Sequence, residues 1–532
     1  MIRSRSLTWS LIPLLVSLGL SCGTQQLLPT DPVELMTTLS ALAAFGPKHV
    51  GSDEGRAAAA YIRDRMKSIG LSDLREESFS FPRWQSTSSS MSLTVDGQAM
   101  SPGFDVFESS GPGHADADVV WASTATDSDL AGLALTGKVA LVVRDPSFHR
   151  AAQYKNVIGK GAAAMLYLSI SPSNLRQVGS VRFDWESAGT IPAITIGAVD
   201  GAILSAAVKA GKSVRATIDV AVSSTPSVGA NIVGTIPGER PEQIVIGAHY
   251  DTWFAGSTDN GGGVAELLAL AARRMKQAKP RYTLVFVAYD GEEVALYGGY
   301  DFLRKHRVLA NDPILAVLNF ESPSATDAQL SGLAHSNQPA LDAALQAGRL
   351  NLIYAVYIGL EAVAGFFGGI IPTDIQGTYR SGVPTVSTAV SGPYYHTTED
   401  TPDKVDLALL AASTDGFDLA LTAMMADEPA AFAVADPQVW TAELATSGSD
   451  PITLTATVHD GKGVMQGGVS ARVSVLVDDF TLAGTYTATS DASGKLNVQI
   501  PKGVATMGAG KRYLHLAAGP TYPLVEKIIA LP

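Results

Sequence analysis

Two apolar, β-branched runs, at 244–248 and 283–289, are the strongest constraint that this sequence places on its fold. Each run ends abruptly in imidazole or acidic residues, and a glycine-opened segment with helical periodicity lies between them at 263–277. Strands and helices continue to alternate from 229 to 428, and the strand runs are almost continuously apolar. This pattern predicts an α/β fold, with a mostly parallel sheet and helices on both faces.

The chain has 532 residues, which is too long for one ordinary core and predicts several domains. We expect the α/β domain to be split into an N-terminal part at 33–81 and a main part at 229–428. An inserted α+β domain, with short strands between Gly, Asp and Ser turns, is expected at 82–228. Short alternating strands separated by Asp-Gly and Ser-Gly turns predict a C-terminal, immunoglobulin-like β-sandwich at 436–532.

The N-terminus predicts export from the cell. Two arginines precede an apolar run at 7–20, which is short for a membrane-spanning helix but suits the core of a signal peptide at 1–22. The single cysteine, Cys22, follows in LGLSCG, which resembles a bacterial lipoprotein cleavage box with Cys22 as the lipidated residue. The alternative is simple secretion with an incidental cysteine. We therefore expect a cell-envelope lipoprotein or a secreted protein, without disulfides inside the chain.

The overall charge argues against one class of partner. The chain has 38 Lys and Arg against 51 Asp and Glu, which gives a net charge of −13. Because phosphate binding draws on clustered Lys and Arg, we expect no nucleic acid as the principal partner.

Residues that can bind metal follow successive strands of the main α/β part. In open α/β sheets, ligands bind beyond the carboxyl ends of the strands, so side chains that follow different strands meet at one edge. The residues concerned are His249, Asp251, Asp259, Glu292, Glu293, Glu321 and His396. Imidazole and carboxylate groups are donors that zinc accepts, and this number of carboxylates suits two ions.

Each of these motifs also has an ordinary structural interpretation. Asp-Asn-Gly at 259–261 is a strong turn signal, and the acidic pair at 292–293 resembles a solvated charge run. A histidine before Thr-Thr-Glu-Asp is typical of a surface loop or a helix cap. These interpretations do not explain why every motif stands just past a strand-like run, in a consistent order. The combination favours a metal site.

The amino-acid sequences of these motifs resemble those of the co-catalytic di-zinc aminopeptidase family, which also includes the glutamate carboxypeptidase II-like enzymes. The matching motifs are HYDT, STDNGGGVA, AYDGEE, LNFE and YYHTTEDTPDKVD, together with the opening helix GSDEGRAAAAYIRDRMKSIGL. The resemblance covers about 35–428. Within it, the segment that begins GKVALVVRDPSFHRAAQYKN resembles a protease-associated domain. The resemblance implies a zinc aminopeptidase-like α/β fold and a peptide substrate.

The resemblance also implies a role for each metal-binding residue. Asp259 would bridge two zinc ions. His249 and Glu321 would complete the shell of one ion, and Glu293 and His396 that of the other.

Three further residues take roles in catalysis by the same resemblance. Glu292 would be the general base, which takes a proton from the attacking water and passes it to the leaving amine. Asp251 would accept a hydrogen bond from His249 and fix its tautomer. Tyr395 is a candidate for a hydrogen bond to the tetrahedral oxyanion.

The sequence departs from the family pattern at two positions. Glu321 stands where the aminopeptidases usually have Asp, so its carboxylate reaches about one bond length farther. In PTDIQGTYRSG, Thr373-Asp374 resembles the Ser-Asp of the family's Ser-Asp-His, and Ile375 replaces the His.

We expect an exported zinc exopeptidase. Of the two ends of a peptide substrate, we favour cleavage at the N-terminal one, which makes the enzyme an aminopeptidase. One alternative is a glutaminyl cyclase-like acyltransferase with a single zinc. Another is a binding protein that has lost catalysis, against which the retained Glu292 argues.

Overall fold

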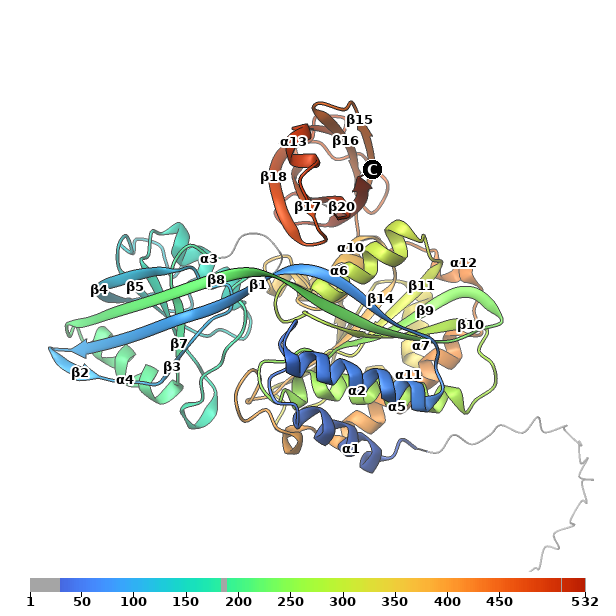
Figure 1. Ribbon diagram of the computed structural model, residues 1–532, viewed down its shortest axis with the longest axis horizontal. Helices are drawn as coiled ribbons and strands as arrows, with labels where there is room; N and C mark the ends of the chain where they lie inside the picture. The colour runs from blue at the N-terminus through green and yellow to red at the C-terminus, as the bar shows by residue number, and fades with distance from the viewer. Residues whose placement is uncertain (1–28, 183–188, 509, 532) are drawn as a thin grey trace, which may run out of the picture.

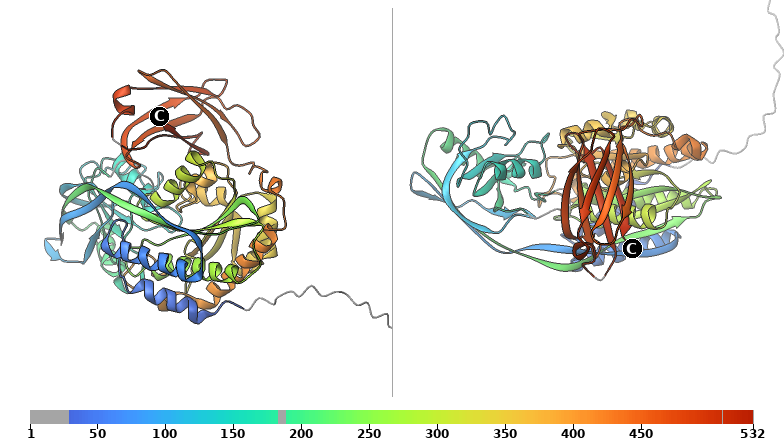
Figure 2. Two further views of the ribbon diagram at one scale, coloured as in Figure 1. Left: turned by 45° about the vertical axis from the view of Figure 1, so that its right-hand side comes forward. Right: turned by 90° about the horizontal axis from the view of Figure 1, so that it is seen from above.

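The computed structural model describes residues 29–182, 189–508 and 510–531. The predicted signal segment at 1–22, including Cys22, lies outside this part of the chain. Figure 1 shows three parts: an α/β body on the right, a smaller lobe on the left, and a β-sandwich above the body. Seen from above in Figure 2, the lobe and the body lie side by side and a long two-stranded ribbon joins them.

The body is built on the larger half of a 14-stranded sheet, in the order β13-β12-β14-β11-β9-β10-β8. The four central strands β14, β11, β9 and β10 are parallel, whereas β8 is antiparallel to β10 and β12 is antiparallel to β14. The bounds are β8 (Val214–Ile236), β9 (Arg240–His249), β10 (Tyr282–Tyr289), β11 (Ile314–Asn319), β12 (Leu330–His335), β13 (Val356–Gly359) and β14 (Thr385–Ser391). The predicted α/β class, with a largely parallel sheet, is confirmed.

Helices cover both faces of this sheet because successive residues of its central strands are all apolar. Ile244 and Ile246 pack with α2, α5 and α11 on one face, whereas Val245 between them packs with α6, α9 and α10 on the other. The bounds are α1 (Pro32–Ala43), α2 (Asp53–Ile69), α5 (Gly262–Met275), α6 (Tyr297–Leu303), α7 (Pro339–Ala347), α8 (Leu350–Ile353), α9 (Leu360–Phe366), α10 (Gln376–Arg380), α11 (Leu407–Met424) and α12 (Pro429–Phe432). By length and composition α11 resembles a membrane span, but it is half buried and packs against α5 and α7.

The ribbon that joins body and lobe differs from the sequence-based prediction. We expected an inserted domain of short strands to begin at 82, whereas β1 (Ser72–Val95) continues across that position and pairs with β8 along its whole length. Both strands therefore pass through the expected domain boundaries near 82 and 228. The serine-rich stretch around 86–90 is exposed, so no hydrophobic alternation marks it as a strand. Its backbone stays extended because it pairs with β8, with one register shift between Ser86 and Ser88.

The lobe carries the other half of the large sheet. Strands β4, β5, β6 and β7 are parallel and follow β8 in the order β8-β4-β5-β6-β7-β3, with an apolar cluster on each side. The bounds are β2 (Gln98–Met100), β3 (Phe104–Val106), β4 (Gly113–Trp121), β5 (Val139–Val143), α3 (Arg150–Gly159), β6 (Ala164–Leu168), β7 (Ala193–Ile196) and α4 (Ala198–Lys209).

The C-terminal part is a sandwich of two antiparallel sheets, β15-β16-β19 and β18-β17-β20-β21, around its own apolar cluster. A second apolar cluster joins it to the body, where Phe480 and Tyr513 meet Phe79 and Tyr297. The bounds are β15 (Thr441–Ser447), β16 (Ile452–His459), β17 (Ser470–Val477), β18 (Thr481–Thr489), β19 (Lys495–Ile500), α13 (Lys502–Ala505), β20 (Arg512–Gly519) and β21 (Val525–Leu531).

Candidate metal centre

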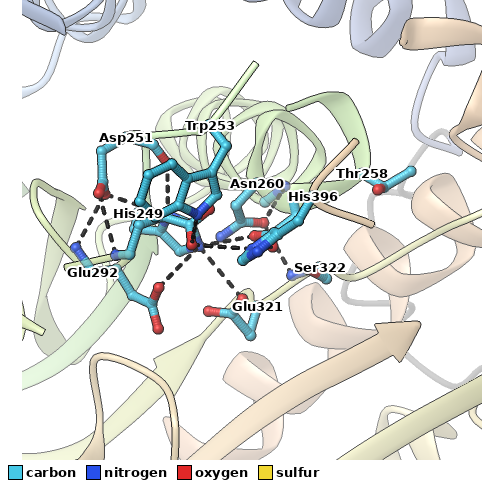
Figure 3. Close-up of polar contacts among 12 residues, drawn as sticks. His249, Asp251, Trp253, Thr258, Asn260, Glu292, Glu321, Ser322 and His396 are labelled. Atoms are coloured by element: carbon cyan, nitrogen blue, oxygen red, sulfur yellow. Dashed lines mark hydrogen bonds and ion pairs between the residues drawn. The ribbon is translucent and has the colours of Figure 1, made fainter. Parts of the chain in front are cut away.

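The carboxyl ends of the central strands bring the predicted residues to one place, and Figure 3 shows His249, Glu292, Glu321 and His396 there. His249 is the last residue of β9, and Glu321 stands two residues past the end of β11. Glu292 and Glu293 follow β10, and the loop after β14 supplies His396. Asp259 comes from the turn that opens α5. The five predicted ligands therefore converge although up to 147 positions separate them in the chain, from His249 to His396.

The ligands form two clusters that share Asp259. In the first, His249 Nε2 lies 3.2 Å from Asp259 Oδ1 and 3.4 Å from Glu321 Oε1. In the second, His396 Nε2 lies 3.0 Å from Asp259 Oδ2 and 3.0 Å from Glu293 Oε2. The two oxygens of one carboxylate thus face two different sites. This is the arrangement that a bridging ligand between two metal ions requires.

Both imidazole rings are oriented so that Nε2 can bind a metal. His249 Nδ1 is 3.0 Å from the main-chain oxygen of Asp251, and His396 Nδ1 is 3.1 Å from that of Val178. A carbonyl oxygen only accepts hydrogen bonds, so the proton of each neutral ring is on Nδ1 and the lone pair is on Nε2. Each Nε2 atom faces carboxylate oxygens, which suits a bound metal cation or, without one, a proton on Nε2.

The burial and spacing of these donors fit zinc. Glu293 Oε1 and Glu321 Oε2 are buried and have no hydrogen-bond partner among the residues described. Two donors bound tetrahedrally to one zinc ion lie roughly 3.3 Å apart, because zinc–donor bonds are about 2.0–2.2 Å long. The separations of 3.0–3.4 Å within each cluster are close to this value. The longer side chain of Glu321 therefore still brings its carboxylate into the first cluster.

Glu292 stands beside the two clusters without belonging to either. Its Oε2 atom is 4.0 Å from His249 Nε2, and the carboxylate is nearly buried. Burial and the neighbouring Glu321 carboxylate raise the pKa of Glu292 well above its ordinary value. A carboxylate that binds no metal but stands next to the ligands is placed to accept a proton there.

Asp251 differs in one detail from the prediction. The hydrogen bond of His249 goes to its main-chain oxygen, and its carboxylate Oδ1 is 3.4 Å from the same nitrogen. The carboxylate mainly accepts the backbone N–H groups of Glu292 and Glu293, at 3.1 and 3.2 Å. Asp251 therefore fixes both the histidine and the loop that carries Glu292. Asp251 thus connects the end of β9 to the loop that follows β10.

Three residues around the ligands were missed in the sequence. The Asp400 carboxylate accepts the N–H groups of Thr258 and Asp259, at 2.8 and 3.2 Å, and so holds the shared ligand. The Trp253 indole donates to Glu293 Oε2 at 2.6 Å. Asp400 stands inside the matched motif that contains His396, and Trp253 directly follows the motif HYDT, which was a usable signal. Val178 contributes only its main chain, which no sequence pattern marks.

The lobe takes part in the centre through its loop at 177–178. Val178 accepts from the His396 ring and donates its N–H to the main-chain oxygen of His396, at 3.1 Å in both cases. The Gln177 side chain donates to the main-chain oxygen of Tyr395 at 3.1 Å. The position of one metal ligand therefore depends on contacts with the inserted part of the chain.

Tyr395 packs its ring on His396, with 3.7 Å between the ring centroids and 17° between the ring planes. Burial raises the pKa of its hydroxyl above the ordinary value, so the phenol keeps its proton and can donate. Its role at an oxyanion stays a prediction.

Comparison with known proteins adds the following. Residues 231–419 match the family model described as Peptidase family M28. A probable glutamate carboxypeptidase of Arabidopsis thaliana is 32% identical over 97 residues, which are 17% of this chain and 14% of that protein. A probable leucine aminopeptidase of Trichophyton verrucosum is 27% identical over 202 residues, covering 33% of this chain and 51% of that protein. The chain thus spans only a small part to about half of the length of these relatives.

A solved structure shows a similar fold. The aminopeptidase from Aneurinibacillus sp. strain AM-1 superimposes with a TM-score of 0.56 at 23% identity, over 74% of this chain and 93% of that one. The match of residues 231–419 to the model of Peptidase family M28, together with the two clusters that share Asp259, indicates a metallopeptidase domain of the co-catalytic class.

Proposed function

We propose that this chain is a zinc aminopeptidase, which binds two zinc ions and removes N-terminal residues from peptides. The observation that carries the proposal is the pair of clusters that share Asp259, with Glu292 beside them. The leucine aminopeptidase of Trichophyton verrucosum supports the choice of the N-terminal end. The match to a glutamate carboxypeptidase is shorter and leaves the C-terminal end as the alternative.

The chemistry follows from the positions of the side chains. Bound zinc would lower the pKa of a water molecule and polarise the scissile carbonyl group. His249, Asp259 and Glu321 would hold one ion, and Asp259, Glu293 and His396 the other. Glu292 takes the proton of the attacking water and later gives it to the nitrogen of the leaving amine. Tyr395 donates a hydrogen bond to the oxygen that becomes negatively charged.

The test is Glu292→Gln, which keeps size and polarity but removes the base. We expect kcat for hydrolysis of leucine p-nitroanilide to fall by about 10²- to 10⁴-fold, since this is the usual contribution of general base catalysis. Zinc content, measured by atomic absorption, should not change because Glu292 is not a ligand. Glu399→Gln is a matched control, since Glu399 is exposed on the loop that carries His396. Full activity of Glu292→Gln would disprove the mechanism.

The number of zinc ions separates this proposal from its closest alternative. A glutaminyl cyclase-like acyltransferase would use a single zinc ion, whereas both clusters here bring three donors together. We expect about two zinc ions per chain and release of amino acids. One ion per chain, with cyclisation of an N-terminal glutamine, would favour the acyltransferase.

We also propose that the protein is exported and anchored to the membrane through lipidated Cys22. The support is the sequence alone: an apolar signal core directly before the single cysteine. Cys22→Ser should move the protein from the membrane fraction to the soluble fraction of a bacterial host. An unchanged distribution would contradict lipidation.

A further inference from the structure

Asp374 is a buried carboxylate that the proposed reaction does not yet use. It lies two residues before α10 and is 3% exposed. Neither of its carboxylate oxygens has a hydrogen-bond partner in the described part of the chain. The Gly299 N–H is near enough to favour the charged form, but it makes no hydrogen bond of normal geometry. Burial of an unpaired carboxylate is strongly unfavourable, so such a group requires an explanation.

The neighbours of Asp374 place it at the edge of the metal centre. Its main chain lies against Gly299 of α6, the helix that follows the loop with Glu292. The charges that act most on its carboxylate are those of His249, Glu321 and Asp251, and it acts in turn on Glu292. Asp374 therefore stands near the loop that carries the proposed general base.

The metal ions would not satisfy this carboxylate. Glu293 and Glu321 also have one unpaired oxygen each, but their carboxylates belong to the two clusters that would hold zinc. Asp374 belongs to neither cluster, and it has two unpaired oxygens rather than one. A primary ammonium group, with three donors and a positive charge, would satisfy both oxygens.

The segment that carries Asp374 is held firmly against the body. A side chain at Gly299 would put its Cβ atom 2.2 Å from the main-chain oxygen of Asp374, so only glycine allows this approach. Gln376 accepts the N–H of Ile371 at 2.8 Å and donates to Glu526 Oε1 of the sandwich at 2.6 Å. The backbone that carries the carboxylate is thus held in place before any ligand arrives, which reduces the entropic cost of binding.

We propose that Asp374 binds the α-ammonium group of the substrate's first residue and so places the first peptide bond beside Glu292. The inference rests on the proposed aminopeptidase function and adds the group that recognises the N-terminus. It predicts that the enzyme requires a charged, unblocked N-terminus. An acetylated N-terminus has neither the charge nor the three donors.

The experiment compares leucine p-nitroanilide with its N-acetyl derivative in the zinc-loaded enzyme. In Asp374→Asn we expect kcat/KM for the free amine to fall by about ten- to a hundredfold, mainly through KM, because a charge-assisted hydrogen bond is lost. The acetylated substrate should be hydrolysed only poorly by the wild type, and its kcat/KM should not fall further in the variant. Asp327→Asn is the matched control, because it replaces an exposed carboxylate by an amide in the same way. A loss shared by both substrates would indicate a structural role and overturn the proposal.

Inhibition gives a second readout that does not depend on the chemical step. We expect the inhibition constant of 3-methylbutylamine to rise at least about tenfold in Asp374→Asn, because the variant binds the amine more weakly. The inhibition constant of 3-methylbutanol should stay unchanged. Equal inhibition of wild type and variant by the amine would overturn the proposal while the aminopeptidase function stands. If the wild type releases only C-terminal residues, the proposed function itself is wrong. If Asp374→Asn does not fold, Asp374→Glu is tested in its place. Its carboxylate is displaced, so KM should rise for leucine p-nitroanilide and not for the N-acetyl derivative.

Discussion

Asp400→Ala tests whether the backbone around the shared ligand is held by a side chain. The Asp400 carboxylate is 2% exposed and accepts two backbone N–H groups, from Thr258 and from Asp259 itself. Removal of the acceptor leaves two buried donors unpaired. Each costs about 1–3 kcal/mol, so the free energy of unfolding should fall by about 2–6 kcal/mol. Zinc affinity should fall by about 10- to 100-fold, the usual effect of losing a residue that orients a ligand.

The two effects are measured separately. Urea unfolding of the zinc-free protein gives the stability, and competition with a chelator gives the zinc affinity. Asp403→Ala is the control: it removes an exposed carboxylate, paired with Lys404, three positions along the same loop. If Asp400→Ala is less stable but binds zinc as tightly as the wild type, the hydrogen bonds serve the fold and do not orient Asp259.

Two further changes test the surroundings of the centre. Trp253→Phe removes the indole donor to Glu293 and should weaken zinc binding by about tenfold in chelator competition; unchanged affinity would mean that Trp253 only packs there. Glu266 is buried on α5 with one donor, Ser413, and burial raises its pKa to about 8. Between pH 4.5 and 8, the folded protein therefore keeps a proton on Glu266 that the unfolded chain releases. The free energy of unfolding should decrease as the pH rises through this window, by up to about 1.4 kcal/mol per pH unit. Glu266→Gln should reduce this slope in urea titrations at several pH values, and an identical slope would contradict the assignment.

The sequence was sufficient for those parts of the site that depend on side-chain identity and strand order. His249, Glu293 and Glu321 each stand at or just past the end of an apolar strand, and parallel pairing brings such ends together. The short strands β12 and β13 were not predicted, because neither is long nor consistently apolar.

Other features depend on contacts between residues far apart in the chain. The main-chain oxygen of Val178 orients His396 across 218 positions, and every residue has such an oxygen. The continuous strand β1 was missed because pairing with β8, and not the pattern of its own side chains, keeps its exposed half extended. Sequence patterns report on burial, and these features are set by backbone pairing.

The junction between the sandwich and the body has a consequence for how this chain can be divided. Arg304 of the body is 1% exposed and lies 3.8 Å from the ring centre of Phe480 and 4.5 Å from that of Tyr513. Glu526 of the sandwich accepts from Tyr300 of α6, the helix that follows the loop with Glu292.

Such a junction makes the C-terminal part a partner of the catalytic body, unlike an accessory module on a flexible linker. A protease cut in the connection at 433–438 should leave two fragments that stay together and keep their activity. Residues 29–435 produced alone would instead expose Tyr297, Tyr300 and the guanidinium of Arg304 to water. A shortened enzyme should therefore aggregate unless the sandwich is supplied separately.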